Sequence, residues 1–172
     1  MYPTIINLNF FEQPIKMLKY FNSLELSPPT PKDNWPGLRS KNLCQINQKL
    51  HISIITKILK MYYNEDLLYE KINIKKSSIF FHKIRYEDWK NHNKIYTRIH
   101  KDDCSLASII YLNEDINDEN TGTSIFDENK KPILKISNTF NTIACYDGNI
   151  YHGATGLNKL ERNTLVIFLN IE

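Results

Sequence analysis

The sequence predicts a mainly β protein: a double-stranded β-helix (jelly roll) with N-terminal helices packed on one of its two sheets. Two patterns favour this fold class. In the N-terminal third, apolar residues recur every three to four positions, which is typical of amphipathic helices. From residue 78 onward, short β-branched and aromatic runs alternate with polar turns, as in antiparallel sandwiches and barrels. The length of 172 residues predicts a single domain, 1–172.

The N-terminal segment, 1–70, is expected to form a helical support. A first helix is predicted over 12–24, where Pro14 suits the first turn. Residues 27–40 are rich in Pro, Asp and Asn, and the Trp35-Pro36-Gly37 step favours a turn in which Gly supplies a positive φ. A second, stronger helical pattern covers 43–63.

The catalytic core is expected over 78–170. Its candidate strands are 78–86, 96–100, 106–112, 123–126, 133–136, 142–146, 151–153 and 163–170. Eight short antiparallel strands wound as two facing sheets make a jelly roll, and helices can cover the outer face of one sheet. The acidic segment 113–120 is interpreted as a solvated hairpin loop, with a substrate-facing lid as the alternative.

Composition excludes several classes of protein. Hydrophobic residues make up 41% and charged residues 24%, so the chain is neither disordered nor fibrous. No apolar run approaches the roughly 18 residues that a membrane span needs, and Met1–Phe10 lacks the features of a signal peptide. We therefore expect a cytoplasmic location and no membrane association. A net charge of +3 without a basic cluster does not indicate a nucleic-acid partner.

Cys44, Cys104 and Cys145 are too few and too widely spaced for a disulfide framework or a zinc knuckle. We interpret them as buried thiols. His51, His82 and His92 are expected to be structural or exposed.

A candidate metal site begins with His100 and Asp102 at the end of a predicted strand. Side chains two residues apart on a strand point the same way and can share one ion. A single His-x-Asp is a weak signal, because a turn cap explains it equally well. His152, after the turn at Asp147-Gly148, adds a third ligand. Two imidazoles and one carboxylate on one face of iron leave positions open for a chelating cosubstrate and O₂.

Arg162 follows His152 by ten residues, and Thr164 shares its side-chain parity. An Arg that points into an apolar barrel needs an anion, because an unpaired buried charge is costly, and its planar fork matches a carboxylate. Arg162 therefore predicts a dicarboxylate ligand. Tyr111 and Thr164 could instead be ordinary strand residues of the core.

These motifs together resemble the iron(II)- and 2-oxoglutarate-dependent oxygenases, specifically the prolyl-4-hydroxylase-like branch. His100-Lys101-Asp102, His152 and Arg162-Asn163-Thr164 look like that family's His-x-Asp…His…Arg-x-Ser/Thr signature. In addition, 109–113 looks like its Tyr-Leu-Asn strand, and Gly122 stands where a Gly pair is usual.

The resemblance implies residue roles. His100, Asp102 and His152 would be the metal ligands that bind Fe(II). Arg162 would bind the distal carboxylate of 2-oxoglutarate, and Tyr111 and Thr164 would hydrogen-bond this cosubstrate. O₂ would be the second cosubstrate.

The predicted function is that of a 2-oxoglutarate-dependent dioxygenase. It would hydroxylate an organic substrate while converting 2-oxoglutarate to succinate and CO₂. A protein or peptide side chain is the first expectation and a small molecule the second; the 35–39 loop and the 113–120 loop could frame its groove. Two alternatives remain: a cupin-like metal- or sugar-binding jelly roll, and a nucleic-acid demethylase. The demethylase branch carries a second Arg where this chain has Phe168.

Overall fold

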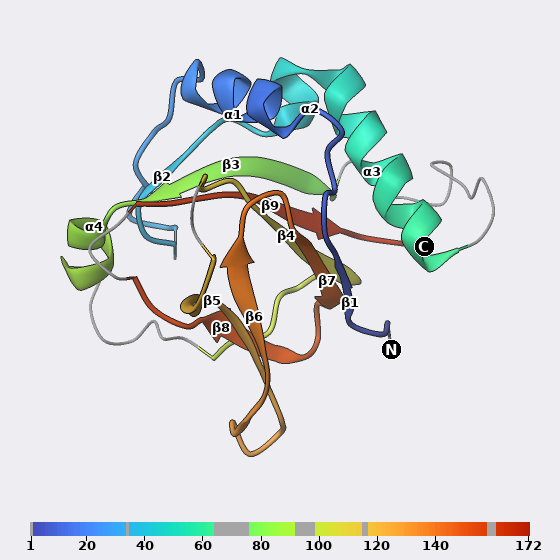
Figure 1. Ribbon diagram of the computed structural model, residues 1–172, viewed down its shortest axis with the longest axis vertical. Helices are drawn as coiled ribbons and strands as arrows, with labels where there is room; N and C mark the ends of the chain where they lie inside the picture. Colours follow the sequence, from blue (N-terminus) through green and yellow to red (C-terminus); the bar gives the residue numbers. More distant parts are fainter. Residues whose placement is uncertain (1, 34, 64–75, 92–98, 115–116, 158–160) are drawn as a thin grey trace.

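The computed structural model describes residues 2–33, 35–63, 76–91, 99–114, 117–157 and 161–172. Within this part of the chain two antiparallel sheets face each other (Figure 1). The larger sheet has the order β1 (Ile5–Asn7), β7 (Ile143–Asp147), β4 (Leu106–Tyr111), β9 (Arg162–Leu169), β3 (Ser78–Ile84) and β2 (Leu38–Arg39). The smaller sheet has the order β6 (Pro132–Thr139), β5 (Asn117–Phe126) and β8 (Tyr151–Ala154). The predicted jelly-roll class is confirmed.

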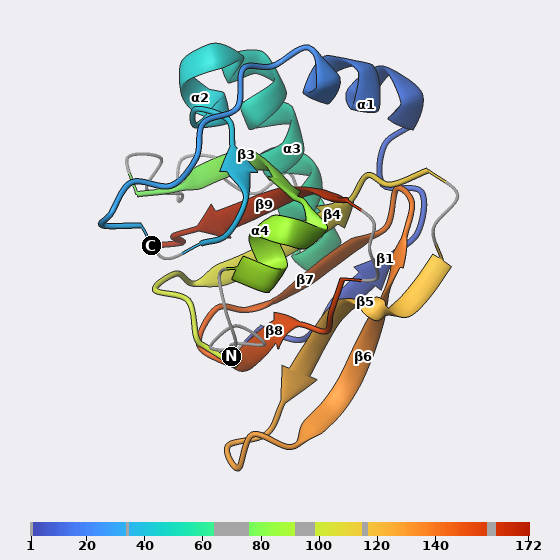
Figure 2. The same ribbon diagram turned by 90° about the vertical axis from the view of Figure 1, so that its left-hand side faces the viewer.

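Helices α1 (Pro14–Asn22), α2 (Leu43–Ile46) and α3 (Gln48–Tyr62) cover the outer face of the larger sheet, and the smaller sheet lies on its other side (Figure 2). A short helix, α4 (Tyr86–Asn91), follows β3. The predicted helix over 43–63 is interrupted at Asn47, whose backbone leaves the helical region (φ −156°). The Asn47 side chain accepts a hydrogen bond from the Leu50 amide (3.0 Å), so the same residue ends α2 and caps α3.

The larger sheet serves two layers because its strands alternate. On β9, Leu165, Ile167 and Leu169 pack in the hydrophobic core beneath the helices, together with Phe21 and Ile58. The side chains between them point to the opposite face. There Arg162, Thr164, Val166 and Phe168 line a cavity between the sheets. One strand thus supplies both the fold's core and a candidate site.

The N-terminal third contributes more than helices. It adds β1 and β2, which the sequence analysis did not predict, as the two edge strands of the larger sheet. Gly37 turns the chain into β2 with a φ of +84°, as the Trp35-Pro36-Gly37 step predicts. A Cβ at this position would lie 2.2 Å from the Lys83 carbonyl oxygen, so Gly lets this segment press against β3.

Two further predictions, one of a loop and one of a strand, need correction or fall partly outside the described residues. Residues 117–120 belong to β5 rather than to a hairpin loop. Most of the strand predicted over 96–100 lies outside the described residues; within them, His100 forms an isolated antiparallel bridge with His152. Among the described helices, none is long and apolar enough to cross a lipid bilayer.

Candidate active site

The structure brings together the three predicted metal ligands. One donor atom from each of His100, Asp102 and His152 lies within 4.8 Å of the other two. The Asp102 carboxylate is 3.5 Å from His100 Nε2 and 3.1 Å from His152 Nε2, measured to its two different oxygens. The His152 side chain is 5% exposed and that of His100 is 50% exposed. The cluster therefore has a closed side at His152 and an open side at His100.

Backbone contacts hold the cluster in place. His100 and His152 exchange a pair of amide-to-carbonyl hydrogen bonds of 2.9 Å each, and the Asp102 amide donates to the Gly148 carbonyl (2.8 Å). A Cβ at Gly148 would lie 2.2 Å from the Cys104 carbonyl oxygen. Only a glycine allows the Asp147-Gly148 turn to approach the 102–104 segment this closely, and this approach sets the position of Asp102.

The hydrogen bonds and charges of the cluster suit cation binding. His152 Nδ1 lies 3.0 Å from the Ile150 carbonyl oxygen, which can only accept, so Nδ1 donates there and Nε2 is the ring atom that faces Asp102. Burial acts to raise the pKa of Asp102, but the hydrogen bonds and charges of His100 and His152 outweigh it and hold that pKa well below its usual range. Two imidazoles and a carboxylate form the donor set typical of non-haem iron(II) sites with open positions, so the residues fit that metal.

A cavity of about 410 Å³ opens beside the cluster. Its lining includes the three ligands, the even-numbered residues of β9 and a wall made by Trp35, Pro36, Arg39 and His82. Among the described residues of the acidic 113–120 segment, none lines this cavity.

Arg162 is buried (4% exposed) in the cavity wall. Its Nη2 donates to Thr123 Oγ1 (3.1 Å), whereas its Nε is buried with no hydrogen-bond partner. Among the described residues no carboxylate forms an ion pair with it. A buried guanidinium with an unused donor fits an anion such as a carboxylate.

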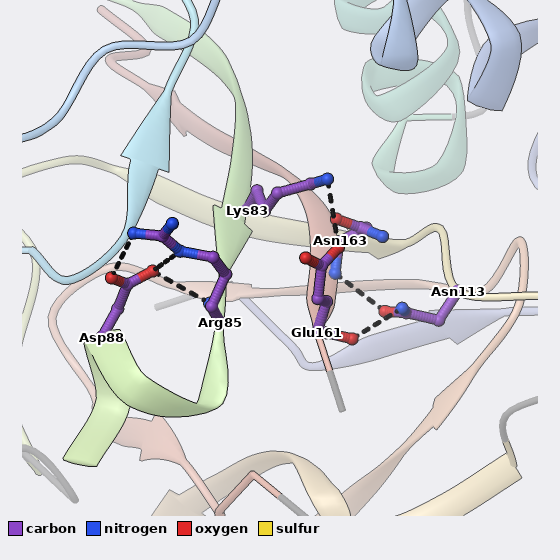
Figure 3. A network of polar contacts seen from close by, with 6 residues as sticks. All are labelled: Lys83, Arg85, Asp88, Asn113, Glu161 and Asn163. Atoms are coloured by element: carbon purple, nitrogen blue, oxygen red, sulfur yellow. Dashed lines mark hydrogen bonds and ion pairs between the residues drawn. The ribbon is translucent and has the colours of Figure 1, made fainter. Parts of the chain in front are cut away.

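The side chain of Asn113 fixes the chain on both sides of Arg162. Its Nδ2 donates to the Glu161 carbonyl and its Oδ1 accepts from the Asn163 amide, each at 2.8 Å (Figure 3). The Glu161 carboxylate also pairs with Lys83 Nζ on β3 (3.0 Å). These contacts determine where β9 begins and hence where Arg162 lies.

Tyr111 and Thr164 lie at the same end of the site in different settings. The Tyr111 hydroxyl donates to Thr123 Oγ1 (2.8 Å), and Tyr111 is fully buried outside the cavity lining. Thr164 lines the cavity, and its hydroxyl donates to the His82 carbonyl (3.4 Å). Thr123, which the sequence analysis missed, therefore connects Tyr111 to Arg162; an isolated Thr on a strand carries no distinguishing signal.

The other described histidines and the cysteines are outside the metal cluster. His51 is buried in α3, His82 is buried in the cavity wall, and His92 lies outside the described residues. The three cysteines are free, as expected, but only Cys145 is fully buried; Cys44 and Cys104 are partly exposed. Burial raises the pKa of the Cys104 thiol to about 12, so it is neutral rather than a thiolate ligand.

The two facing sheets, with a His-Asp-His cluster and a buried Arg between them, define a double-stranded β-helix with a candidate metal and carboxylate site. No protein-family model matches the sequence, and no curated protein sequence matches it. Solved structures do match. A prolyl-4-hydroxylase from Pseudomonas putida superposes with a TM-score of 0.62 at 12% identity, over 99% of this chain and 94% of the other.

Two further structures share the fold. An oxidoreductase of the 2OG-Fe(II) oxygenase family from Burkholderia pseudomallei gives a TM-score of 0.65 at 12% identity, over 97% of this chain and 84% of that one. A prolyl hydroxylase from Trichoplax adhaerens, in complex with a hypoxia inducible factor peptide, gives 0.59 at 10% identity, over 98% and 83%. These structural similarities establish the fold, which is the jelly roll predicted from the sequence.

Proposed function

We propose that this protein is an Fe(II)- and 2-oxoglutarate-dependent oxygenase. The observation that carries the proposal is the placement of the His100, Asp102 and His152 donors in one cavity with Arg162, whose Nε has no partner. Such a metal and cosubstrate together supply reductive activation of O₂, coupled to decarboxylation of 2-oxoglutarate to succinate and CO₂ and to hydroxylation of the substrate.

Each residue has a role in this proposal. His100, Asp102 and His152 hold the Fe(II), and the hydrogen bond from His152 Nδ1 to Ile150 fixes the ring that presents Nε2. Arg162 binds the distal carboxylate of 2-oxoglutarate. Thr164 lines the same pocket, and Tyr111 borders it through Thr123.

The apolar part of the cavity wall has a role too. Ile109, Val166 and Phe168 exclude water from the reacting groups, which limits side reactions.

The substrate is proposed to be an organic molecule, in the first instance a protein or peptide side chain. The Trichoplax adhaerens structure, a prolyl hydroxylase with a bound peptide, supports this choice. A ferrous cofactor must stay reduced, which favours the cytoplasm.

The test is spectroscopic and chemical. Anaerobic addition of Fe(II) and 2-oxoglutarate should produce a weak visible charge-transfer band, and aerobic incubation should release succinate. His100→Ala and Asp102→Ala should lose both signals. Arg162→Ala should bind iron normally but require more 2-oxoglutarate.

Asp88→Ala is the matched control, because Asp88 is a carboxylate paired with Arg85 near the surface, outside the cavity lining. It should behave as the wild type. A wild-type protein that binds metal but shows no charge-transfer band would instead indicate a cupin-like binding module. Succinate release that survives the loss of His100 or Asp102 would contradict the metal assignment.

A further inference from the structure

A second guanidinium, that of Arg39, lines the same cavity as Arg162. Arg39 lies on β2 and pairs with His82 on β3, which in turn pairs with Thr164 on β9. Since neighbouring strands lie about 4.8 Å apart, β2 and β9 are separated by roughly 10 Å. The two Arg residues therefore start from different strands, and they mark two different parts of the cavity wall.

The Arg39 side chain is held rigidly by aromatic rings. Its Cζ lies 4.5 Å from the centroid of the Trp35 ring and 5.5 Å from that of Phe80. Its backbone is fixed by hydrogen bonds with Ser27 (2.8 and 2.9 Å). Stacking of this kind orients a guanidinium and leaves its N–H edge free for a ligand.

This guanidinium lacks a compensating anion. Its Nε is buried without a hydrogen-bond partner, and no carboxylate among the described residues forms an ion pair with it. Burial lowers the pKa of Arg39 to about 10, and the charges of Asp102 and Asp33 oppose this only in part. A partly desolvated cation with an unused donor is costly unless an anion binds to it.

The other basic groups of this wall are already engaged. His82 Nε2 contacts the Pro36 carbonyl, and burial, together with the charges of Arg39 and Arg162, holds the pKa of His82 well below its usual value, so its ring is neutral. Lys101 pairs with Glu128 and lies over the Tyr151 ring. Besides Arg162, Arg39 is therefore the cationic group among the described lining residues that has a charge and an unpartnered Nε.

We propose that Arg39 binds a carboxylate of the substrate, so that the enzyme acts on a carboxylic acid with an apolar body. This rests on the proposed function, in which Arg162 serves 2-oxoglutarate. The apolar body would lie against Trp35, Ile84 and Phe168, which line the cavity with Arg39. The carboxylate can come from a free acid or from the C-terminus of a peptide.

The test compares acids with their neutral amides. N-acetyl derivatives of leucine, proline and phenylalanine are titrated by calorimetry, as acids and as amides, into protein loaded with Mn(II) and 2-oxoglutarate under anaerobic conditions. A second arm uses acetylated pentapeptides with the same last residues and a free or amidated C-terminus. At least one acid should bind about tenfold tighter than its amide, as expected for a charge-assisted bidentate contact, and the arm in which it occurs identifies the source.

Variants assign the preference to Arg39. Arg39→Gln should abolish the acid-over-amide preference, and Arg39→Lys should retain only part of it because an ammonium lacks the planar fork. Arg85→Gln is the matched control, since Arg85 is half-exposed, pairs with Asp88 (2.7 Å; Figure 3) and does not belong to the cavity lining. It should keep the full preference. If Arg39→Gln does not fold, Arg39→Lys carries the comparison.

Two results would overturn the proposal: no acid in either arm binds better than its amide, or the preference persists undiminished in the folded Arg39 variants. The charge-transfer band of wild-type protein with Fe(II) and 2-oxoglutarate separates this outcome from failure of the proposed function. A band without acid preference rejects the Arg39 site alone, whereas the absence of the band rejects the oxygenase.

Discussion

Thr123 is a small residue on which two larger groups of the site depend. Its Oγ1 accepts hydrogen bonds from both the Tyr111 hydroxyl and Arg162 Nη2. Both donors are buried, so neither can turn to water if the acceptor is lost. The orientation of Arg162 thus depends on a hydroxyl that itself belongs to no recognisable motif.

Thr123→Val keeps the shape of this residue and removes the acceptor. We expect a loss of about 1–3 kcal/mol in the free energy of unfolding, because two buried donors lose a partner, together with weaker binding of 2-oxoglutarate. Urea denaturation and anaerobic titration of the charge-transfer band measure the two effects. Thr121→Val, on the same strand and also buried, should cost stability without changing 2-oxoglutarate affinity; equal affinity in both variants would remove Thr123 from the site.

Sequence patterns predict the metal and carboxylate ligands of the site better than they predict the residues around these ligands. His100, Asp102, His152 and Arg162 have side chains whose chemistry is distinctive at their spacing, and the structure places all four around one cavity. Arg39 carried no such signal, because its significance comes from its stacking on Trp35 and Phe80, which only the packed chain shows.

At the scale of elements, β9 joins the core to the site, and its start is set by Asn113. Because that amide bonds to residues on both sides of Arg162, a shift of the strand end would move the guanidinium. The Tyr-Leu-Asn segment thereby acquires a physical meaning: Tyr111 contacts Thr123, Leu112 is in the core, and Asn113 holds β9.

Asn113→Ala should raise the 2-oxoglutarate concentration needed for half-saturation several-fold and destabilise the protein by about 1–3 kcal/mol. The matched control is Asn170→Ala at the other end of β9, where Asn170 Nδ2 donates to the Lys76 carbonyl (3.1 Å). That variant should lose stability with unchanged 2-oxoglutarate binding. The same affinity loss in both variants would show that Asn113 has only a structural role.

The elements missed at the sequence level were short or polar. β1 and β2 have three and two residues, too few for an alternating pattern to emerge. They form because their backbones hydrogen-bond to the neighbouring strands β7 and β3. Residues 117–120 are Asn, Asp, Glu and Asn, a composition that disfavours strands, yet the β5–β6 pairing includes Asn117 and Asp118. The long helical pattern, by contrast, was strong enough to hide a break at Asn47.

At the scale of the whole molecule, buried neutral imidazoles link stability to pH. Burial lowers the pKa of His51 and of His82, and nearby Arg charges lower that of His82 further. An unfolded His titrates near pH 6.5. Below that pH the unfolded chain binds more protons than the folded one, so the free energy of unfolding falls as the pH falls.

We therefore expect the urea midpoint to decrease between pH 7 and pH 5. His51→Leu should make this decrease shallower, because it removes one of the two groups while keeping an apolar side chain in the helix layer. Denaturation curves of the metal-free protein at several pH values measure the slope. An unchanged slope in the variant would mean that His51 binds protons equally in the folded and the unfolded chain, which would contradict a lowered pKa.

The alternation of β9 separates two kinds of evolutionary constraint. Leu165, Ile167 and Leu169 secure folding beneath the helices, while Val166 and Phe168 between them line the cavity, and Val166 also packs against the smaller hydrophobic cluster between the sheets. Selectivity can therefore diverge by exchange of every second residue, with the hydrophobic layer left intact. A library randomised at Val166 and Phe168 alone would explore new chemistry on a scaffold that still folds.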